Sequence, residues 1–266
     1  MVDKQVFLLL YTSMFRYSNA IQTSSTTPLR PSSPSPRLIL LDRDGVINHD
    51  VGAPGVLHSS QLKLTNDAAN AIANFRNHGC KVAIITNQSC VGKSLITNND
   101  LISIHDTLQT MLLEDNANAV IDQIFTCTSL RDSGDYRMKP NPGMIYEACD
   151  YFGFQPEECV MIGDALRDLE AASAAGVPTK ILVETGYGLG IMNGQTALSG
   201  DCGNEADNGN TIVRLVDDQY CQKFGYPLGM TMDTILPFYY TKDLSMATSW
   251  ILQEQQHHLQ HHVKII

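Results

Sequence analysis

Short, mainly apolar runs alternate with amphipathic stretches along the middle of this chain. Five runs have the length and composition of strands that are buried on both faces: 38–41, 82–85, 121–125, 160–162 and 181–183. Three stretches between them carry apolar residues at helical spacing: 66–78, 99–113 and 142–152. Alternating strand and helix patterns indicate βαβ units, and the sequence therefore predicts an α/β fold with a doubly wound parallel sheet.

Polar residues follow the predicted strands in a regular way. The sequence DRDGVIN comes directly after the first run, at 42–48, and TNQS after the second, at 86–89. Lys139 and Pro140 follow the third region, and GD, at 163–164, follows the fourth, with Asp168 four residues on. Ligands of doubly wound sheets bind beyond the carboxyl ends of the strands. These residues are therefore predicted to meet at one edge of the sheet.

Asp42 and Asp44 are the first candidates for chemistry. They are two residues apart, so in extended backbone their side chains project from the same side. Two close carboxylates persist when a cation neutralises them or when one of them holds a proton. A carboxylate can attack phosphorus, while a protonated neighbour donates to the leaving oxygen and later activates water. Gly45 lets the backbone turn away sharply after the pair.

The other strand ends supply complementary groups. The Thr86 hydroxyl suits donation to a phosphate oxygen, and Lys139 brings a positive charge for the phosphoryl group. Asp164 adds a hard oxygen ligand, and carboxylates with phosphate oxygens and waters are the ligand set of Mg²⁺. Each residue alone also has a structural explanation, as a cap, a surface charge or a turn residue. Their order at successive strand ends favours a phosphate site.

These four segments resemble the motifs of the haloacid dehalogenase (HAD) superfamily of phosphohydrolases: DxD, a strand-end Thr or Ser, a Lys and a late acidic motif. The sequences LDRDGVIN (41–48), ITNQS (85–89), KPNPGM (139–144) and MIGD (161–164) with Asp168 are most similar to the branch of heptose bisphosphate and histidinol phosphate phosphatases. The resemblance covers about residues 37–186. It implies a Rossmann-like HAD core without a large cap domain, since the segment between the first two motifs is short.

The resemblance also implies a role for each matching residue. Asp42 would be the nucleophile and a metal ligand, and Asp44 the general acid/base that binds the metal through its backbone carbonyl. Thr86 and Lys139 would hold the phosphate, and Asp164 would complete a Mg²⁺ site. The residues expected to assist at the phosphate or to line the substrate pocket are Asn48, Asn87 and Arg137.

Two departures from the branch change the expectation. Its members often carry a zinc loop of one His and three Cys before the Lys motif, but residues 127–139 keep only Cys127, so no structural zinc is expected. The heptose enzymes place Arg directly before the Lys, whereas this chain has Met138 there and Arg137 one residue earlier. Heptose bisphosphate itself is therefore less strongly indicated than a sugar phosphate or bisphosphate in general.

Composition narrows the remaining alternatives. The leading prediction is a Mg²⁺-dependent phosphatase acting on a small phosphorylated metabolite, with a histidinol phosphatase or a polynucleotide 3′-phosphatase as alternatives. The formal net charge of −10 argues against a nucleic-acid partner, because backbone binding needs clustered Lys and Arg. A catalytically silent binding protein with the same fold is a further alternative, disfavoured because all the expected catalytic groups are present. The oligomeric state is left open.

The ends of the chain add expectations on organisation. Residues 1–36 are rich in Ser and Thr and end in a Pro-rich linker, which is typical of either a disordered arm or a transit segment; the location would be cytoplasmic or organellar. Residues 37–255 would form the phosphatase domain, with a long insertion at about 187–231, and 256–266 a His-rich tail. A strand is expected at 234–240, followed by a helix that Asp243 caps and that runs to Leu252. No apolar run approaches the roughly 20 residues that cross a bilayer. The seven scattered cysteines are expected to be buried thiols.

Overall fold

The protein folds around one mostly parallel sheet. The computed structural model describes residues 36–192, 213–219, 221 and 234–263, with side chains up to 255. The strands are β1 (Leu38–Leu41), β2 (Lys81–Asn87), β3 (Gln123–Cys127), β4 (Cys159–Gly163), β5 (Thr179–Val183), β6 (Val213–Val216) and β7 (Phe238–Thr241). Their order in space is β3-β2-β1-β4-β5-β7-β6, and only the β6–β7 pair is antiparallel.

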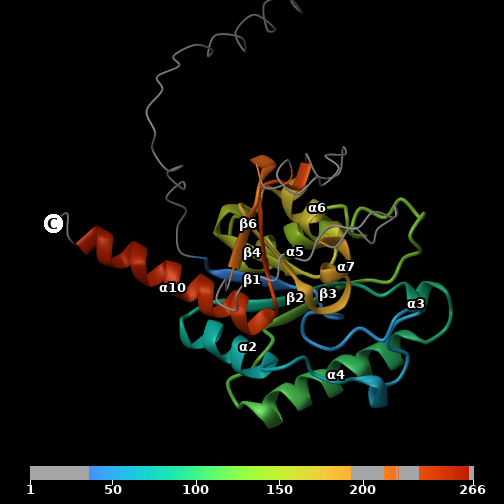
Figure 1. Ribbon diagram of the computed structural model, residues 1–266. Helices are drawn as coiled ribbons and strands as arrows, with labels where there is room; N and C mark the ends of the chain where they lie inside the picture. The colour runs from blue at the N-terminus through green and yellow to red at the C-terminus, as the bar shows by residue number, and fades with distance from the viewer. Residues whose placement is uncertain (1–35, 193–212, 220, 222–233, 264–266) are drawn as a thin grey trace, which may run out of the picture. The chain divides into compact units, whose positions relative to one another are not determined.

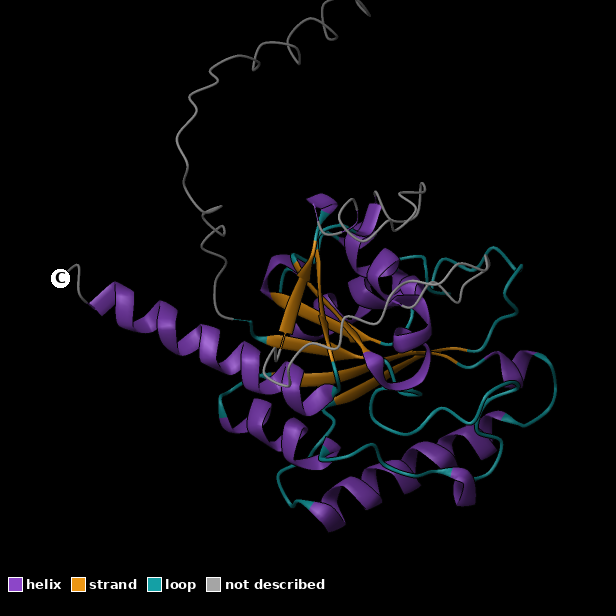
Figure 2. Cartoon of the chain, viewed as in Figure 1, coloured by secondary structure: helices purple, strands orange, loops and turns teal. Residues whose placement is uncertain are grey.

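Helices cover both faces of this sheet (Figures 1 and 2). The α-helices are α2 (Ala68–Asn77), α3 (Ser89–Gly92), α4 (Asn98–Asp115), α5 (Gly143–Phe152), α6 (Leu166–Ala175), α7 (Leu189–Met192) and α10 (Leu244–Val263). Three shorter helical turns are η1 (Ser59–Gln61), η2 (Pro156–Glu158) and η3 (Glu184–Gly188). Helices α2, α4 and α10 share a core with one face of the sheet, and α5 and α6 share a core with the other.

The apolar runs explain this two-sided packing. Successive residues of a strand point to opposite faces. Accordingly Ile39 and Leu41 of β1 pack in the core of α2 and α4, while Leu38 and Leu40 pack in the core of α5 and α6. All four side chains are fully buried. A strand with two buried faces must be apolar at every position, which is why the runs lack an alternating pattern.

The predicted α/β fold is confirmed, with three local differences. The third strand begins at Gln123, two residues after the predicted start; ahead of it, the Asp122 amide donates to Val82 O at 2.8 Å and the Asp122 carboxylate accepts from the Val82 amide at 2.9 Å. The strand predicted at 234–240 begins only at Phe238, after a helical turn at 234–235. The range 187–231 includes α7 and β6, which its composition did not predict.

Other expectations can be placed only in part. The described cysteines are all buried and free: Cys80, Cys90, Cys127, Cys149, Cys159 and Cys221. Residues 1–35, most of the predicted insertion and the side chains of the His-rich tail lie outside the described residues, although the tail backbone continues α10 to Val263. Among the described residues, no helix is long and apolar enough to cross a membrane.

The strand order determines where a ligand can bind. From β1 the chain moves outward through β2 and β3, then returns to the other side of β1 with β4 and β5. The switch point lies between β1 and β4, whose carboxyl ends carry Asp42 and Asp164. Loops that leave neighbouring strands in opposite directions open a crevice there. The pattern-based prediction of the site's position therefore agrees with the topology.

Candidate active site

A tight turn after β1 presents the two aspartates of the DxD motif. The Asp42 amide donates to Ile162 O of β4 at 3.0 Å, which extends the sheet by one residue. The chain then reverses, since the Ile47 and Asn48 amides donate to Arg43 O at 2.9 and 3.2 Å. Gly45 has a φ of +81°, and a side chain there would collide with the Asp164 carboxylate. Glycine is thus required both for the turn and for the approach of Asp164.

A buried lysine joins two carboxylates beside this turn. Lys139 Nζ lies 3.0 Å from Asp42 Oδ1 and 2.6 Å from Asp168 Oδ1, and it donates to Ile85 O at 2.7 Å. The side chains of Lys139, Asp42 and Asp168 are all at most 5% exposed. Asp42 Oδ1 also accepts from the Arg43 amide at 2.7 Å. One oxygen of the proposed nucleophile is therefore fixed in place, and Oδ2 receives no hydrogen bond from the described residues.

Asp164 completes an acidic cluster at the switch point. Ligand oxygens of Asp42, Asp164 and Asp168 lie within 4.8 Å of one another. Asp164 Oδ2 accepts from the Tyr187 amide at 3.0 Å, while the buried Oδ1 has no hydrogen-bond partner. A side chain at Gly186, like one at Gly45, would collide with Asp164, so both glycines allow the backbone to close on this carboxylate.

Electrostatics show that the cluster is short of positive charge. Burial, with the nearby charges of Asp42 and Asp168, raises the pKa of Asp164 to about 8. Burial also raises the pKa of Asp42, although Lys139 opposes this shift. Buried carboxylates with a free oxygen persist where a divalent cation can neutralise them. The donor set therefore fits a hard metal ion bound through oxygen.

Asp44 lies in a different environment from Asp42. Its carboxylate accepts from the side-chain amides of Asn48 and Gln88, both at 2.9 Å, and from the Arg43 guanidinium at 2.8 Å. Burial acts to raise its pKa, but the Arg43 charge and these hydrogen bonds outweigh burial and hold the pKa of Asp44 below its ordinary value. The pKa values of the two aspartates are thus shifted in opposite directions, and an acid role for Asp44 requires a phosphate group beside it to offset the Arg43 charge.

The structure places the remaining predicted residues at varying distances from the acidic cluster. Thr86 is buried at the end of β2, and its Oγ1 accepts from the Gln88 amide at 3.0 Å. Asn48 contacts Asp44, and its buried Oδ1 has no partner. Asn87 is bonded through both amide atoms to the Lys139 backbone, at 3.0 and 3.1 Å. It therefore positions the lysine here, and its contact with a phosphate stays a prediction.

Arg137 is not joined to the cluster in this arrangement. Its guanidinium donates to both Glu147 oxygens of α5, at 2.6 and 3.1 Å, and its side chain is 40% exposed. It makes no hydrogen bond or ion pair with the acidic cluster. A role in substrate binding would require Arg137 to leave Glu147.

Three site residues were assigned no role from the sequence. Asp168 shares Lys139 with Asp42, and its Oδ2 caps α6 by accepting from the Ala165 amide at 3.1 Å. Arg43 and Gln88 form the network around Asp44. All three belong to the motifs quoted above, so their position next to a candidate residue could have drawn attention to them. Their contacts depend on the direction of each side chain, which the sequence does not give.

Asp135 organises the segment that corresponds to the zinc loop of related sequences. Its Oδ2 accepts from Ser129 Oγ at 2.5 Å and from Cys127 Sγ at 3.5 Å, and its Oδ1 accepts from the Arg137 amide at 2.8 Å. Its backbone carbonyl accepts from the Asn141 amide at 3.0 Å. Asp135 thus connects the two ends of the segment that leads to Lys139. The absence of a structural zinc stays a prediction.

Comparison with known proteins agrees with this geometry. Residues 46–176 match the sequence model of the haloacid dehalogenase-like hydrolases. D-glycero-β-D-manno-heptose-1,7-bisphosphate 7-phosphatase from Bordetella bronchiseptica is 35% identical over 152 residues, which are 57% of this chain and 83% of that protein. The protein of the same name from Haemophilus ducreyi is 30% identical over 159 residues, 58% of this chain and 86% of that one.

A solved structure resembles the whole core. The crystal structure of D,D-heptose 1,7-bisphosphate phosphatase from B. bronchiseptica, complexed with magnesium and phosphate, has a TM-score of 0.61 and 27% identity. The match covers 82% of this chain and 99% of the B. bronchiseptica chain. Fold and relatives together define a phosphoric monoester hydrolase of the α/β class. The chain belongs to the haloacid dehalogenase-like hydrolase family.

Proposed function

We propose that this protein is a Mg²⁺-dependent phosphatase of a sugar phosphate or bisphosphate, and that Asp42 attacks the phosphorus atom. The observation that carries this proposal is the arrangement of Asp42: Lys139 and the Arg43 amide fix Oδ1, and Oδ2 receives no hydrogen bond from a described residue. A carboxylate fixed in this way at the switch point of the sheet is oriented for nucleophilic attack.

The reaction would proceed in two steps. A carboxylate oxygen of Asp42 forms a bond to phosphorus while the ester P–O bond breaks, and Asp44 gives a proton to the leaving alcohol oxygen. A water molecule then loses a proton to Asp44 and attacks phosphorus, which releases phosphate and restores the Asp42 carboxylate. Lys139 and the Thr86 hydroxyl would stabilise the charge on the transferring phosphoryl oxygens, where most of the rate enhancement of such enzymes arises.

The metal is assigned to the oxygens that lack partners. Asp42, Asp164 and the backbone carbonyl of Asp44 would hold Mg²⁺, which fits the orphaned Asp164 Oδ1 and the excess of buried carboxylates. When bound, the ion would offset the negative charge of the cluster and of the phosphate. Asp168, which shares Lys139 with Asp42, would keep the lysine aimed at the nucleophile.

Arg167 supports a substrate with a second anionic group. It lies in the first turn of α6, between Asp164 and Asp168, and is partly buried. Its guanidinium lies 5.8 Å from the centre of the Tyr187 ring and forms no ion pair with a described residue. A guanidinium without a carboxylate partner can bind phosphate in a bidentate manner. The related proteins are named for a sugar bisphosphate, and heptose 1,7-bisphosphate is therefore the first compound to test.

The test is phosphate release from a panel of phosphate esters. We expect Mg²⁺-dependent release from one or more sugar phosphates or bisphosphates, and we expect Asp42→Asn to abolish it. Arg167→Met should raise KM for a bisphosphate but leave KM for a monophosphate nearly unchanged, because the second phosphate is absent from the latter.

The same panel separates the alternatives. Faster release from histidinol phosphate or from a 3′-phosphorylated oligonucleotide than from any sugar phosphate would replace the substrate class and leave the mechanism in place. No release from any ester, with the protein folded and Mg²⁺ present, would contradict the proposed function and favour a silent binding protein.

A further inference from the structure

A buried arginine lies directly behind the proposed acid/base. The side chain of Arg43 is 0% exposed, and charged side chains are almost never fully buried unless they are paired. Its Nη2 donates to Asp44 Oδ1 at 3.0 Å and Oδ2 at 2.8 Å, and its Nε lies 3.3 Å from Oδ1. A planar guanidinium that binds both carboxylate oxygens restricts the orientation of the carboxylate as well as its position.

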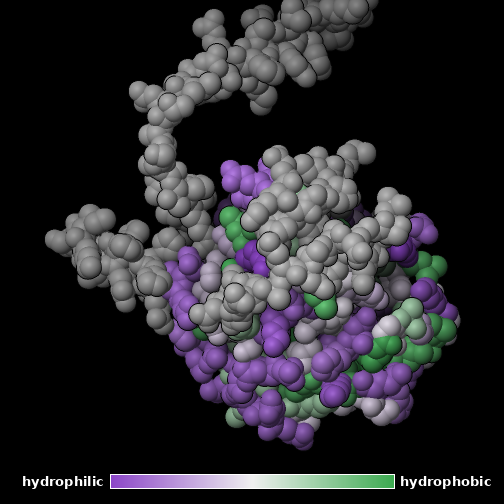
Figure 3. Space-filling model, viewed as in Figure 1, coloured by the Kyte–Doolittle hydropathy of each residue, from purple (hydrophilic) through white to green (hydrophobic). Residues whose placement is uncertain are grey.

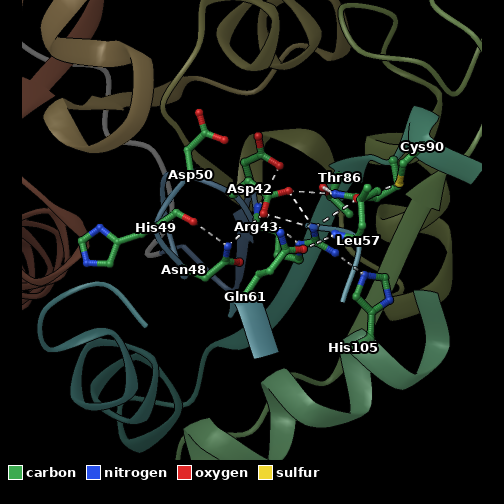
Figure 4. A network of polar contacts seen from close by, with 12 residues as sticks. Asp42, Arg43, Asn48, His49, Asp50, Leu57, Gln61, Thr86, Cys90 and His105 are labelled. Carbon is green, nitrogen blue, oxygen red and sulfur yellow. Dashed lines mark hydrogen bonds and ion pairs between the residues drawn. The ribbon is translucent and has the colours of Figure 1, made fainter. Parts of the chain in front are cut away.

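Arg43 also contacts a histidine of the neighbouring helix α4. Its Nη1 donates to His105 Nε2 of α4 at 3.1 Å, and Figure 4 shows the His105 ring turned toward the arginine. Arginine has no acceptor atom, so this contact requires a neutral His105 with its proton on Nδ1. Burial and the adjacent Arg43 charge lower the pKa of His105 to about 4, which keeps the ring neutral at physiological pH.

Gln88 connects the same network to the phosphate side of the site. Its Oε1 accepts from Arg43 Nη2 at 3.1 Å. Its Nε2 donates to Asp44 Oδ2 at 2.9 Å and to Thr86 Oγ1 at 3.0 Å. One amide group therefore fixes the spacing between the Asp44 carboxylate and the hydroxyl proposed to bind phosphate. The distance from His105 to Thr86 is bridged entirely by hydrogen bonds.

We propose that Arg43 and His105 are positioning residues for Asp44: together with Gln88 they hold its carboxylate at the point where the leaving oxygen departs and the attacking water arrives. The inference rests on the proposed function, because it requires Asp44 to exchange a proton with these oxygens. Neither Arg43 nor His105 would touch substrate.

The alternative role for Arg43 and His105 is structural, with Arg43 and Asp44 forming a buried ion pair that stabilises the fold. The two roles differ in how they depend on the leaving group. A positioning residue matters when the leaving oxygen needs a proton, as in an alkyl phosphate. It matters much less for an aryl phosphate, whose leaving group departs as an anion. A structural role would slow bond breaking in both esters equally.

The experiment compares kcat for the best sugar phosphate with the single-turnover rate of nitrophenol release from 4-nitrophenyl phosphate, which measures bond breaking alone. Because small misplacements of a catalytic group are costly, we expect Arg43→Lys to lower kcat for the sugar phosphate by about 100-fold and His105→Leu by about 10-fold. Both variants should lower the maximal rate of the first, bond-breaking step on the aryl ester by less than about 3-fold. His105→Gln should recover most of the loss in His105→Leu, since its Oε1 can accept from Arg43.

A double-mutant cycle with Asp44→Asn separates the inference from the proposed function. If Arg43 acts through Asp44, Arg43→Lys should cause no further loss in the Asp44→Asn background. Full activity of Asp44→Asn on the sugar phosphate would overturn the proposed acid/base. A large loss in Asp44→Asn, with equal losses on both esters or additive losses for Arg43→Lys and His105→Leu, would overturn the positioning role alone.

Discussion

The carboxyl edge of the central sheet, where its parallel strands end, and the amino edge, where they begin, differ in their balance of acidic and basic side chains. At the carboxyl edge, Asp42, Asp164 and Asp168 gather around Lys139. At the amino edge, the Asp122 carboxylate accepts from the Val82 amide and pairs with two cations.

The pairing at the amino edge accounts for the stability of that region. Arg76 of α2 and Lys81 of β2 both pair with Asp122, so its carboxylate is fully compensated and its pKa is lowered, although burial opposes the shift. The carboxyl edge has a surplus of acid and a carboxylate oxygen without a partner. A site that binds a cation and transfers phosphate needs such a surplus, whereas a structural cluster does not. Charge balance therefore distinguishes the two regions, and so does burial, since the Arg76 and Lys81 side chains are 27% and 48% exposed.

The largest effect is expected at the nucleophile. Asp42→Asn keeps the volume and the hydrogen bond from the Arg43 amide but removes the attacking charge, so kcat should fall by at least about 10⁴-fold. Phosphate release from the best substrate measures this loss. Asp122→Asn is the matched control at the other edge of the sheet. If that variant lost activity to the same degree while folded, the division between the two edges would be wrong.

Removal of the metal ligand tests the surplus of charge. Mg²⁺ at 100 times its dissociation constant should raise the free energy of unfolding of the wild type by about 2.7 kcal/mol, because it binds only the folded state. Asp164→Asn should lose most of this stabilisation and most of the activity. Thermal unfolding with Mg²⁺ and with EDTA gives the comparison. Equal Mg²⁺ stabilisation of the wild type and the variant would remove Asp164 from the metal site.

At the amino edge the expected effect is on stability. Asp122→Asn weakens contacts to Arg76 and Lys81 and to a backbone amide, and hydrogen bonds to charged groups contribute about 2 kcal/mol each in favourable cases. The free energy of unfolding should therefore fall by about 2 kcal/mol, with kcat unchanged. Urea unfolding and a steady-state assay measure the two quantities. A fall in kcat with unchanged stability would contradict a structural role.

The smallest effect concerns the pH dependence of stability. His105 is neutral in the folded protein down to a pKa of about 4, while its ordinary value is 6.5. Below pH 6.5 the unfolded chain takes up a proton that the folded state does not, so stability falls as the pH decreases from 6.5 toward 4. Relative to His105→Gln, which cannot titrate, the wild type should lose about 1 kcal/mol per pH unit in this window. Parallel pH profiles for the two proteins would contradict a buried neutral His105.

Much of the fold could be predicted because its determinants are local. The apolar run at 38–41 and the Asp pair after it specify a buried strand that ends at a site, and the structure has both. Asp243 was predicted to cap the last helix, and its Oδ1 accepts from the Met246 amide at 2.9 Å. The strand β6 was missed because Arg214 interrupts its apolar residues and only Val216 is buried, so it lacks the apolar pattern of the central strands.

The sequence indicated which residues lie at the site but not which atoms contact one another. The motif order pointed to Asp42, Thr86, Lys139 and Asp164: Asp42 and Asp164 come directly after β1 and β4, Thr86 lies at the end of β2, and Lys139 lies in the segment between β3 and α5. Which atom each side chain contacts depends on rotamers and on neighbours that are distant in sequence. Asn87 bonds the Lys139 backbone 52 residues away, and Arg43 bonds His105 62 residues away. No spacing in the sequence encodes such pairs.

The central claim is that Asp42 becomes phosphorylated, and trapping the intermediate tests it most directly. Asp44→Asn should still react with 4-nitrophenyl phosphate in Mg²⁺, because that leaving group needs no proton, but it should hydrolyse the phosphoryl-enzyme slowly. Rapid acid quench followed by mass spectrometry of the peptides should then find one phosphoryl group, on Asp42. Burst release of nitrophenol with no phosphorylated peptide, or with the phosphoryl group on another residue, would contradict the account.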